Sequence, residues 1–474
     1  MDKERRKKIQ TTKLVITEIF MLVIVVLTVI VLTFIVMGYH INEDGKLEQS
    51  GLLQIESVPT GASITIDGEA LSSETNTNKI LPEGTHTIEL KKAGYTSWSK
   101  AVNLHSGFLT KLTYPRLYKE DPKIETVLDF DTSPSLFLAS KDHSKGLLKY
   151  PSGKLEIISL ESKTLKSTQL ELSKILKNST PSELENSQII DWSKSGERII
   201  VSSEKDGLTR FFIIDLEHPE YSLDLSAEFD IEISKLEFLN PQGDRLGILE
   251  NHNFRTISLL DKKLSDVLVK NALFFSHNTT KVALTTKASD NTAEVILYDL
   301  GNKSSISLAK SASENIKAYL SEYAGRPTLV FIDDTRIVIR RGELPTENIS
   351  KDNPLNEPVG DYTLSFGTAE DFSFKGENQL VVASKGSNLS VFDLENYQQS
   401  TFNVDASSVF WPDEYTVGGV VDGRLALYDF DGTNKVSFGS SENNFPAIIT
   451  KDGNYLYYIS NTNSRLSLVR SLIK

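Results

Sequence analysis

The chain has no cysteine, and this absence excludes several kinds of chemistry at once. No disulfide, thiolate metal site or cysteine nucleophile can form. Its seven histidines are scattered over 474 residues, and none pairs at the i, i+4 spacing that places two metal ligands on one helix face. If it is exported, this protein must be held together by burial and hydrogen bonds alone.

Positive charge is concentrated at the N-terminus. The net charge is −13, of which residues 1–13 contribute +4 and Glu18 contributes −1, leaving −16 on residues 40–474. A region this acidic does not attract nucleic acid, which excludes it as a partner. We interpret the acidity as a contribution to solubility.

One long apolar run lies near the N-terminus. Ile19–Met37 carries no charge, and as a helix it would span roughly 28 Å, the thickness of a bilayer core. The run ends at Met37–His40 without the small-x-small site of a cleaved signal peptide. The sequence therefore predicts an uncleaved signal-anchor in the cell membrane, with the N-terminus cytoplasmic and the C-terminus extracytoplasmic. The orientation is set by the basic flank, Lys3, Arg5, Arg6, Lys7, Lys8 and Lys13.

A small β module follows the membrane segment. Polar and apolar residues alternate in Ser63–Gly68, His86–Leu90, Lys100–Leu104 and Thr110–Tyr114, and glycines separate these runs. The pattern predicts a small antiparallel β-sandwich.

The same residues resemble the PEGA domain. The similarity runs through Ser57–Gly68, Leu81–Leu90 and Gly94–Tyr95, although Glu74–Asn78 replaces the Gly-Thr-Pro expected between the halves. The resemblance implies a surface-exposed sandwich of envelope and secreted proteins, and it carries no catalytic residue. Its motif positions are Pro59, Gly61, Ala62, Asp67, Gly68, Pro82, Glu83, Gly84, Gly94 and Tyr95.

The rest of the chain repeats with a period near forty residues. One half of each unit is an aromatic anchor, a polar turn and a strand; the other half is a strand ending in Asp. Two hairpins per unit predict the four-stranded blades of a β-propeller, seven or eight in number. Units are expected to begin near residues 125, 189, 233, 271, 316, 363, 408 and 442. The anchors, interpreted as blade-packing residues, are Trp192, Phe238, Phe275, Phe374 and Trp411.

The anchor and turn, in the form Trp-Ser-x-x-Gly, resemble the repeats of TolB-type and related, WD40-like propellers. This resemblance implies a propeller with a binding surface and does not specify a ligand. The Asp after each strand, above all Asp429 and Asp431, leaves calcium as an alternative. Ordinary turn chemistry is the favoured interpretation, because Asp in a turn accepts backbone amides. We therefore expect no metal and no cofactor.

The predicted organisation is an all-β ectodomain on one transmembrane helix. It comprises a cytoplasmic tail (1–13), the membrane helix (14–39) in contact with the lipid bilayer, a linker (40–50), a PEGA-like sandwich (51–117) and a propeller (118–474). The final unit has only three strands of useful length. We predict that Lys123–Phe130 supplies the fourth and closes the ring, since propellers must satisfy their free edges.

No catalytic motif is present: the chain has no phosphate-binding glycine loop, no Gly-x-Ser-x-Gly and no His-Glu-x-x-His. We expect a non-catalytic surface protein that binds a protein or glycan of the cell envelope. The alternative is a propeller hydrolase acting on an envelope glycan or peptide, which needs carboxylates with raised pKa in a deep pocket. Neighbouring acids such as Asp333–Asp334 do not form such a pair on a strand. A third possibility, a signalling receptor, would require a partner helix, since only about thirteen residues lie inside.

Overall fold

The computed structural model describes residues 2–36, 38–41, 45, 47–161, 166–176, 179–288, 292–333, 336–344, 346, 361–364, 366, 369–462 and 465–474. These form two compact units, Met1–Asp121 with Lys474, and Pro122–Ile473. Each unit is described by itself below.

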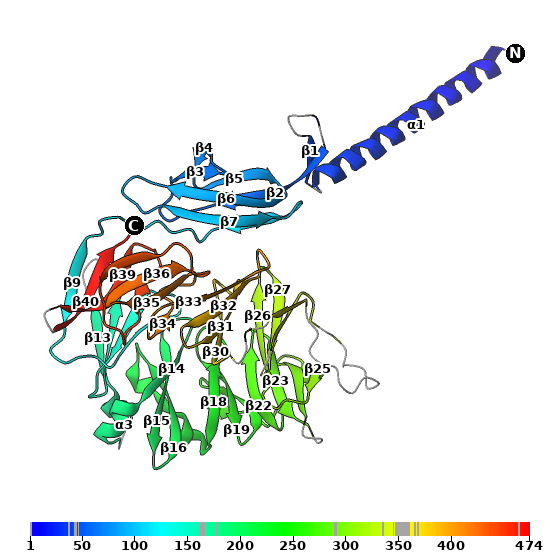
Figure 1. Cartoon of the computed structure of the whole chain (residues 1–474). Helices are drawn as coiled ribbons and strands as arrows, with labels where there is room; N and C mark the ends of the chain where they lie inside the picture. Colours follow the sequence, from blue (N-terminus) through cyan, green and yellow to red (C-terminus); the bar gives the residue numbers. More distant parts are fainter. Residues whose placement is uncertain are drawn as a thin grey trace. The chain divides into compact units, whose positions relative to one another are not determined.

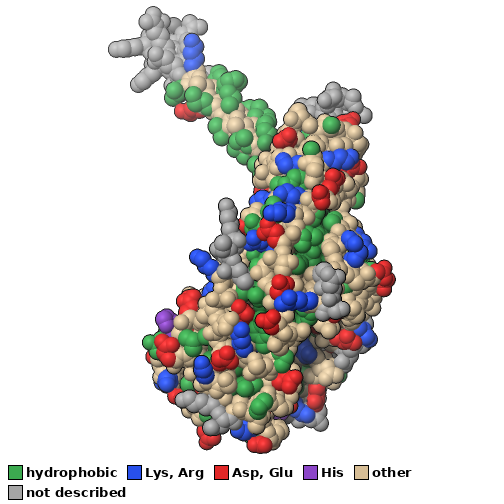
Figure 2. Space-filling model, turned by 90° about the vertical axis from the view of Figure 1, so that its left-hand side faces the viewer, with side chains coloured by type: hydrophobic (Ala, Val, Ile, Leu, Met, Phe, Trp, Pro, Cys, Tyr) green, Lys and Arg blue, Asp and Glu red, His purple; other side chains and the backbone are tan. Residues whose placement is uncertain are grey.

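The first unit begins with one long helix, α1 (Asp2–Val36). Its segment Lys13–Val36 is long and apolar enough to cross a membrane, and none of it is buried in the protein. Figure 2 shows hydrophobic side chains covering this helix. The hydroxyls of Thr17, Thr28 and Thr33 donate to the carbonyl four residues earlier, at 2.7–2.9 Å. The polar atoms of these three side chains are thus satisfied within the helix, as a bilayer requires.

After the helix the chain forms a two-sheet sandwich (Figure 1). One sheet contains β1 (Tyr39–Ile41), β2 (Leu47–Ile55), β5 (Thr77–Pro82) and β8 (Leu109–Leu112). The other contains β4 (Glu69–Glu74), β3 (Ser63–Ile66), β6 (Gly84–Lys91) and β7 (Trp98–Leu104). Their inward faces bury Leu53, Ile64, Leu90 and Trp98. Alternation of buried and exposed residues in β3, β6 and β8 matches the period-two pattern of the sequence.

Two details of the sandwich differ from expectation. The prediction of a wholly antiparallel sandwich is wrong for β8, which pairs with β2 in parallel. Strands β2, β4 and β5 were not predicted. Strands β4 and β5 are mostly exposed, so their alternation is weak, whereas β2 lies between β5 and β8 and buries Leu53 and Ile55.

The second unit forms eight four-stranded sheets within the described residues, the blades of a propeller (Figure 1). The first strands are β10 (Leu136–Ala139), β14 (Gln188–Trp192), β18 (Ile233–Phe238), β22 (Ala272–His277), β26 (Lys317–Tyr323), β30 (Asp371–Lys375), β34 (Val409–Phe410) and β38 (Ile448–Ile449). The second strands are β11 (Lys145–Lys149), β15 (Arg198–Lys205), β19 (Arg245–Glu250), β23 (Lys281–Lys287), β27 (Arg326–Ile332), β31 (Leu380–Lys385), β35 (Thr416–Val421) and β39 (Tyr455–Thr462).

The third and fourth strands complete each blade. The third strands are β12 (Lys154–Ser159), β16 (Leu208–Asp215), β20 (Asn253–Ser258), β24 (Ala293–Asp299), β28 (Ile337–Arg341), β32 (Asn388–Asp393), β36 (Arg424–Asp429) and β40 (Arg465–Leu472). The fourth strands are β13 (Ser167–Glu171), β17 (Leu223–Asp224), β21 (Lys263–Leu264), β25 (Ser304–Ser311), β29 (Tyr362–Leu364), β33 (Gln398–Asn403), β37 (Val436–Ser440) and β9 (Ile124–Asp129). Short helices in the connections are α2 (Leu172–Ile175), α3 (Pro181–Asn186), η1 (Pro219–Tyr221) and α4 (Leu225–Phe229).

The hydrophobic core of the propeller lies between successive blades. One cluster joins the first and second blades through Leu147 and Trp192, and another joins the second and third through Ile213 and Phe238. Further clusters join the third blade to the fourth, the fourth to the fifth and the fifth to the sixth. A cluster containing Phe137 joins the first blade to the last. Each blade is therefore stabilised by its neighbours, and the ring is the unit of stability.

Ring closure follows the prediction made from the sequence. Strand β9 pairs antiparallel with β40, and Figure 1 shows the cyan β9 beside the red β40. Ser467 Oγ donates to Asp129 Oδ1 at 2.7 Å, and Arg470 Nη2 donates to Glu125 Oε2 at 2.8 Å. The last blade therefore contains three strands from the C-terminus and one from the start of the array, and the predicted closure is confirmed.

Two predicted unit boundaries are wrong for the same reason. Residues near 125 belong to β9 of the last blade, and residues near 363 belong to β29, the fourth strand of the fifth blade. The first and sixth blades begin instead at Leu136 and Asp371. A fourth strand and a first strand have similar alternation, so sequence periodicity does not separate them.

Candidate functional site

The first strands of four consecutive blades bring large aromatic side chains and lysines together. We call Lys235, Phe274, Lys317, Tyr319 and Phe372 the aromatic–lysine row; they lie on β18, β22, β26 and β30. The three aromatic side chains are half-buried, whereas the blade cores beside them are closed. Tyr319 and Phe372 also pack against the core cluster between the fifth and sixth blades, so each ring is partly in the core and partly exposed.

Backbone irregularity and a buried hydroxyl position the row. Register shifts occur in β18 between Ile233 and Lys235 and in β22 between Ala272 and Phe274. Such bulges redirect the side chain that follows them. Ser276 Oγ then donates to Ala318 O at 3.0 Å and accepts from the Leu320 N–H at 2.8 Å.

These two bonds hold β26 against β22. Because Tyr319 lies between the two residues that Ser276 contacts, the bonds also fix its position beside Phe274.

The aromatic rings form a continuous series. The ring centroids of Phe274 and Tyr319 are 5.0 Å apart, and those of Tyr319 and Phe372 are 4.2 Å apart. Phe374 extends the series, with its centroid 5.3 Å from that of Phe372. The spacings of 5.0 and 5.3 Å lie in the range of roughly 4.5–7 Å that aromatic pairs prefer, and the Tyr319–Phe372 spacing is shorter than that range. The series thus has mutually supporting rings that cross three blades.

Two lysines flank the first ring of the series. Lys235 Nζ lies 3.7 Å from the Phe274 centroid, donates to Phe275 O at 2.7 Å and pairs with Glu237 at 2.9 Å. Lys317 is exposed, with its Nζ 5.7 Å from the same centroid. Burial lowers the pKa of Lys235, an effect that the Glu237 carboxylate opposes and the Lys317 ammonium reinforces.

The Tyr319 hydroxyl lies in an unusually acidic setting. Burial raises its pKa to about 12, and the carboxylates of Asp371 and Glu237 contribute to that shift. Among the described residues no hydrogen bond to this hydroxyl is present, and the Tyr319 side chain is half-buried. The Tyr319 O–H therefore remains a neutral donor that a bound acceptor can use.

In chemical terms the row combines stacking surfaces, cations and one hydroxyl. Aromatic faces take flat apolar surfaces such as a sugar ring, a proline or another aromatic ring. The ammonium groups of Lys235 and Lys317 can pair with carboxylate or phosphate, or donate to hydroxyls. The arrangement suits binding, and it contains no nucleophile paired with a base.

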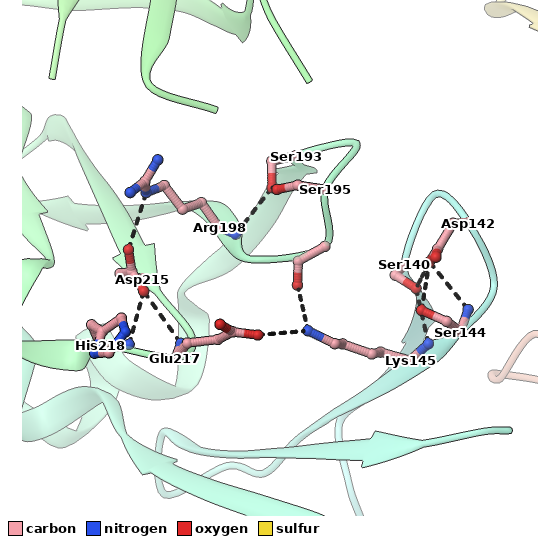
Figure 3. A network of polar contacts seen from close by, with 11 residues as sticks. Ser140, Asp142, Ser144, Lys145, Ser193, Ser195, Arg198, Asp215, Glu217 and His218 are labelled. Carbon is pink, nitrogen blue, oxygen red and sulfur yellow. Dashed lines mark hydrogen bonds and ion pairs between the residues drawn. The ribbon is translucent and has the colours of Figure 1, made fainter. Parts of the chain in front are cut away.

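A second polar cluster joins the turns of the first two blades (Figure 3). Ser140 and Ser144 both donate to Asp142, at 2.8 Å each. Burial raises the pKa of Asp142, but the hydrogen bonds from Ser140 and Ser144 together lower it by a larger amount, so the net shift is downward. Lys145 Nζ reaches into the next blade and donates to Gly196 O at 3.1 Å. The cluster thus connects a turn of the first blade to a turn of the second by a hydrogen bond.

This cluster contains serine, histidine and aspartate, yet they do not form a catalytic triad. The Asp215 carboxylate accepts from the backbone N–H of Glu217 and His218 and from Arg198 Nε. The His218 ring lies instead 3.7 Å from Glu220. Without a histidine oriented by Asp215, the serines of Figure 3 have no general base within the cluster.

The predicted blade anchors occupy two environments. Trp192, Phe238 and Phe275 are buried in clusters between blades. Phe374 is half-buried and touches the aromatic–lysine row, while the half-buried Trp411 has Lys375 Nζ 5.8 Å above its ring. Phe374 therefore contributes to packing and also lies beside the candidate site.

The PEGA motif positions form turns and core contacts. Ala62 is buried, and Pro59 is buried beside it. Asp67 Oδ1 accepts from the Thr87 N–H at 2.8 Å, and Oδ2 lies 2.6 Å from His86 Nδ1. These hydrogen bonds lower the pKa of Asp67. The motif glycines Gly61, Gly68, Gly84 and Gly94 all have positive φ. Pro82 is the last residue of β5, and Glu83 and Tyr95 lie in connections between strands.

The basic flank of the membrane helix is only partly visible. Lys13 lies in α1 with an exposed side chain. The side chains of Lys3, Arg5, Arg6, Lys7 and Lys8 lie outside the described part of the chain.

The aspartates at the ends of strands accept hydrogen bonds from the turns that follow. Strands β16, β24, β32 and β36 end at Asp215, Asp299, Asp393 and Asp429, whereas Asp261 lies three residues beyond the end of β20. Asp299 accepts from the Gly301 and Asn302 N–H groups, both at 2.9 Å. Backbone hydrogen bonds lower its pKa.

At the proposed calcium position, Asp429 accepts from Asn434 Nδ2 and Asp431 accepts from Thr433. Among the described side chains no group of three potential metal ligands is present. Asp334 of the predicted acidic pair lies outside the described residues, and Asp333 pairs with Arg336 at 2.9 Å.

The fold defines the class: a β-propeller preceded by a small sandwich and an apolar helix. Residues 50–117 match the sequence model of the PEGA domain, so the small sandwich is a PEGA domain. The match covers that domain alone. No curated protein sequence matches the chain.

Several solved structures resemble the propeller. One is an oligogalacturonate lyase in complex with manganese, with 11% identity, a TM-score of 0.39, and coverage of 74% of this chain and 96% of that chain. Another is the C-terminal WD40 domain of Sif2, with 12% identity, a TM-score of 0.44, and coverage of 73% and 97%. A third is the β-propeller domain of Cps50 (Swd1) from Myceliophteria thermophila, with 9% identity, a TM-score of 0.41, and coverage of 74% and 99%. The propeller assignment rests on the sheet topology, and these likenesses carry no functional argument.

Sequence analysis alone missed the aromatic–lysine row. Its five members are spaced irregularly, because they come from four different blades and two of them follow bulges. The available signal was local: Phe274 precedes the anchor Phe275, and Phe372 precedes Phe374 by two residues. Phe274 and Phe275 are neighbours on one strand and point to opposite faces, so only Phe275 is buried between blades, whereas Phe372 and Phe374 share a face and are both half-buried.

Proposed function

We propose that this chain is a membrane-anchored binding protein of the cell envelope, with a non-catalytic propeller outside the cytoplasm. Support for the anchor comes from the exposed apolar segment Lys13–Val36 and the basic residues that precede it. Support for the extracytoplasmic location comes from the PEGA domain that follows the helix.

The observation that carries the binding role is the aromatic–lysine row. Three half-exposed rings and two lysines on adjacent blades provide contact area with little loss of side-chain entropy, since the rings already pack on one another. Aromatic residues of this kind dominate the binding energy of interfaces.

The chemistry of the row suits an extended partner with flat apolar groups and hydrogen-bond acceptors. Both a glycan and a protein of the envelope have these groups. The row lies beside the Glu237 and Asp371 carboxylates, so it is distinguished from the rest of the acidic region by its half-exposed aromatic rings and not by net charge.

The hydrolase alternative has less support. A glycosidase general acid needs a carboxyl group with a raised pKa. Among the described residues, every carboxylate with a displaced pKa is displaced downward: Asp67, Glu125, Asp142 and Asp299. The raised pKa values belong to buried tyrosines such as Tyr319.

The test is affinity capture from native cell envelopes with the full-length protein and its variants. Phe274→Ala and Lys317→Glu should each reduce the captured partner at least tenfold, about 1.4 kcal/mol of binding free energy. Matched controls are Tyr221→Ala, whose ring is 71% exposed, and Lys263→Glu on the fourth strand of the third blade; both should capture the partner normally.

Equal capture by the wild type and both row variants would reject this site. Release of soluble glycan or peptide from envelopes incubated with wild-type protein, but not with heat-denatured protein, would favour the hydrolase. Thermal unfolding of each variant verifies that a loss of capture is not a loss of fold.

A further inference from the structure

The PEGA domain exposes four large apolar side chains, and all four lie together. Within residues 49–121, whose side chains the structure describes, the exposed large hydrophobic side chains are Leu52 (36% exposed), Ile80 (62%), Phe108 (67%) and Leu109 (41%). Leu52 on β2 is directly opposite Ile80 on β5 and Leu109 on β8. Opposed residues on neighbouring strands share a face of the sheet, so these side chains form one patch, here called the apolar patch.

The apolar patch adjoins the end of the membrane helix. One residue, Met37, separates the end of α1 from Gly38, whose N–H donates to Ile35 O at 3.0 Å. Gly38 O accepts from the Ser50 N–H at 2.8 Å, and Ser50 O accepts from the Gly107 N–H at 2.9 Å. The sheet therefore begins within hydrogen-bonding distance of the point where the apolar helix ends.

Gly38 makes this short junction possible. Its φ is +80°, and a Cβ there would lie 2.4 Å from Ser50 O and 2.9 Å from Gly107 N. An apolar groove runs along the junction, lined by Val31, Phe34 and Ile35 of the helix and by the apolar patch. The apolar surface of the helix thus continues onto the sheet.

The outward face of the sheet becomes polar away from the helix. Two residues further along the strands, Gln54, Asn78 and Lys111 replace Leu52, Ile80 and Leu109 on the same face. Two residues of β-strand span about 6.6 Å, which falls within the depth of about 5–10 Å to which interfacial segments insert. The distance over which this face changes from apolar to polar therefore matches the depth of the headgroup region.

We propose that the apolar patch of the PEGA domain inserts into the headgroup–acyl boundary of the bilayer that α1 crosses. The proposal rests on the membrane-anchor part of the proposed function and is independent of what the propeller binds. Lipid is the occupant because the patch continues the apolar surface of a spanning helix and is joined to it by one residue. The PEGA domain then lies on the membrane surface, where it is held by two contacts, and does not swing on a flexible tether.

The absence of cysteine makes the test direct, since a single introduced cysteine is the only labelling site. Full-length protein carrying Phe108→Cys or Ile80→Cys is labelled with an environment-sensitive fluorophore and reconstituted in phosphatidylcholine–phosphatidylglycerol liposomes. Both probes should show a blue-shifted emission, several-fold less quenching by iodide, and strong quenching by nitroxide-labelled lipid.

Three further single-cysteine variants calibrate the result. Asn78→Cys, on the same face and strand as Ile80, and Glu69→Cys, on the exposed edge strand β4, should both be quenched by iodide and not by lipid nitroxide. Val26→Cys in α1 should be quenched by lipid nitroxide alone.

Each other result has a definite meaning. Iodide quenching of the Phe108 and Ile80 probes equal to that of Glu69 overturns the proposal. Shielding from iodide without quenching by lipid also overturns it, and indicates a second copy or another protein on the patch. If the Val26 probe is open to iodide, the membrane anchor itself fails, and the proposal fails with it.

Discussion

At the residue scale, adjacent blades of the propeller pack closely at turns where a glycine leaves room for the side chain of a neighbouring blade. Gly243 is in the turn after the anchor Phe238, with φ +70°. A Cβ at this position would lie 2.8 Å from Ser193 Cβ of the preceding blade and 3.1 Å from the Phe238 ring. Ser193 Oγ meanwhile accepts from the Arg198 N–H at 3.0 Å. One glycine therefore controls how closely two blades approach.

Gly243→Ala is expected to destabilise the propeller more than Gly207→Ala. Both glycines have positive φ, so each alanine incurs about 1 kcal/mol or more of backbone strain. Only Gly243 has atoms where the Cβ would go, which adds roughly 1–3 kcal/mol of overpacking. Thermal unfolding followed by circular dichroism measures the difference. Equal unfolding temperatures for the two variants would show that the Gly243 turn relaxes freely.

At the scale of an element, the seam between β9 and β40 holds the ring closed. Glu125 on β9 accepts from Arg470 on β40 and from Lys123 beside it, at 2.8 and 2.6 Å. Hydrogen bonding to Lys123, then to Arg470, lowers the pKa of Glu125 from 4.5 to about 2. This is the largest lowering of a carboxylate pKa among the described residues, and Glu125 lies where the two ends of the array meet.

The lowered pKa predicts how the seam responds to acid. A carboxylate with a depressed pKa in the folded state stabilises that state above its unfolded pKa near 4.5, and the stabilisation is lost as pH falls toward 2. Glu125→Gln should therefore lower the unfolding temperature at pH 6 and have progressively less effect from pH 4.5 to pH 2. The effect is expected to be small, because the side chain is 38% exposed to solvent.

Glu232→Gln is the matched control for the seam. Glu232 is exposed on the third blade, and its replacement should leave the pH dependence of unfolding as in the wild type. A Glu125→Gln effect that is the same at pH 6 and pH 2 would contradict an ionic role for the seam.

At the scale of the whole molecule, the orientation of the chain across the membrane determines in which compartment the propeller lies and which partners it can bind. Protease added to intact cells or spheroplasts should remove the PEGA domain and the propeller and leave the segment before Lys13 intact, because the proposed topology places the basic flank in the cytoplasm. Tags at the two termini report the outcome on immunoblots. Protection of the C-terminal tag in intact cells, with digestion after the membrane is permeabilised, would reverse the proposed topology.

The ring architecture also explains which parts of the fold could be predicted. Burial between blades demands an apolar anchor and a strand at each repeat, and Trp192, Phe238 and Phe275 mark those repeats in the sequence. The apolar helix and the PEGA strands β3, β6, β7 and β8 were predictable because hydrophobic length and period-two alternation are local properties. Closure was predictable because the last blade lacked a strand and Ile124–Asp129 had the right alternation.

The candidate site could not be predicted in the same way. Lys235, Phe274, Tyr319 and Phe372 are separated by 39, 45 and 53 residues, and no local pattern states that their side chains meet. Their proximity depends on the bulges in β18 and β22 and on the Ser276 bonds that seat β26. The apolar patch likewise appears only when β5 and β8 flank β2 and place Ile80 and Leu109 beside Leu52. The sequence by itself determined the anchor, the repeat and the closing strand, because burial imposes a local period. Only the tertiary structure decided which outward-facing side chains gather into a surface, because side chains from different strands and blades meet only after folding.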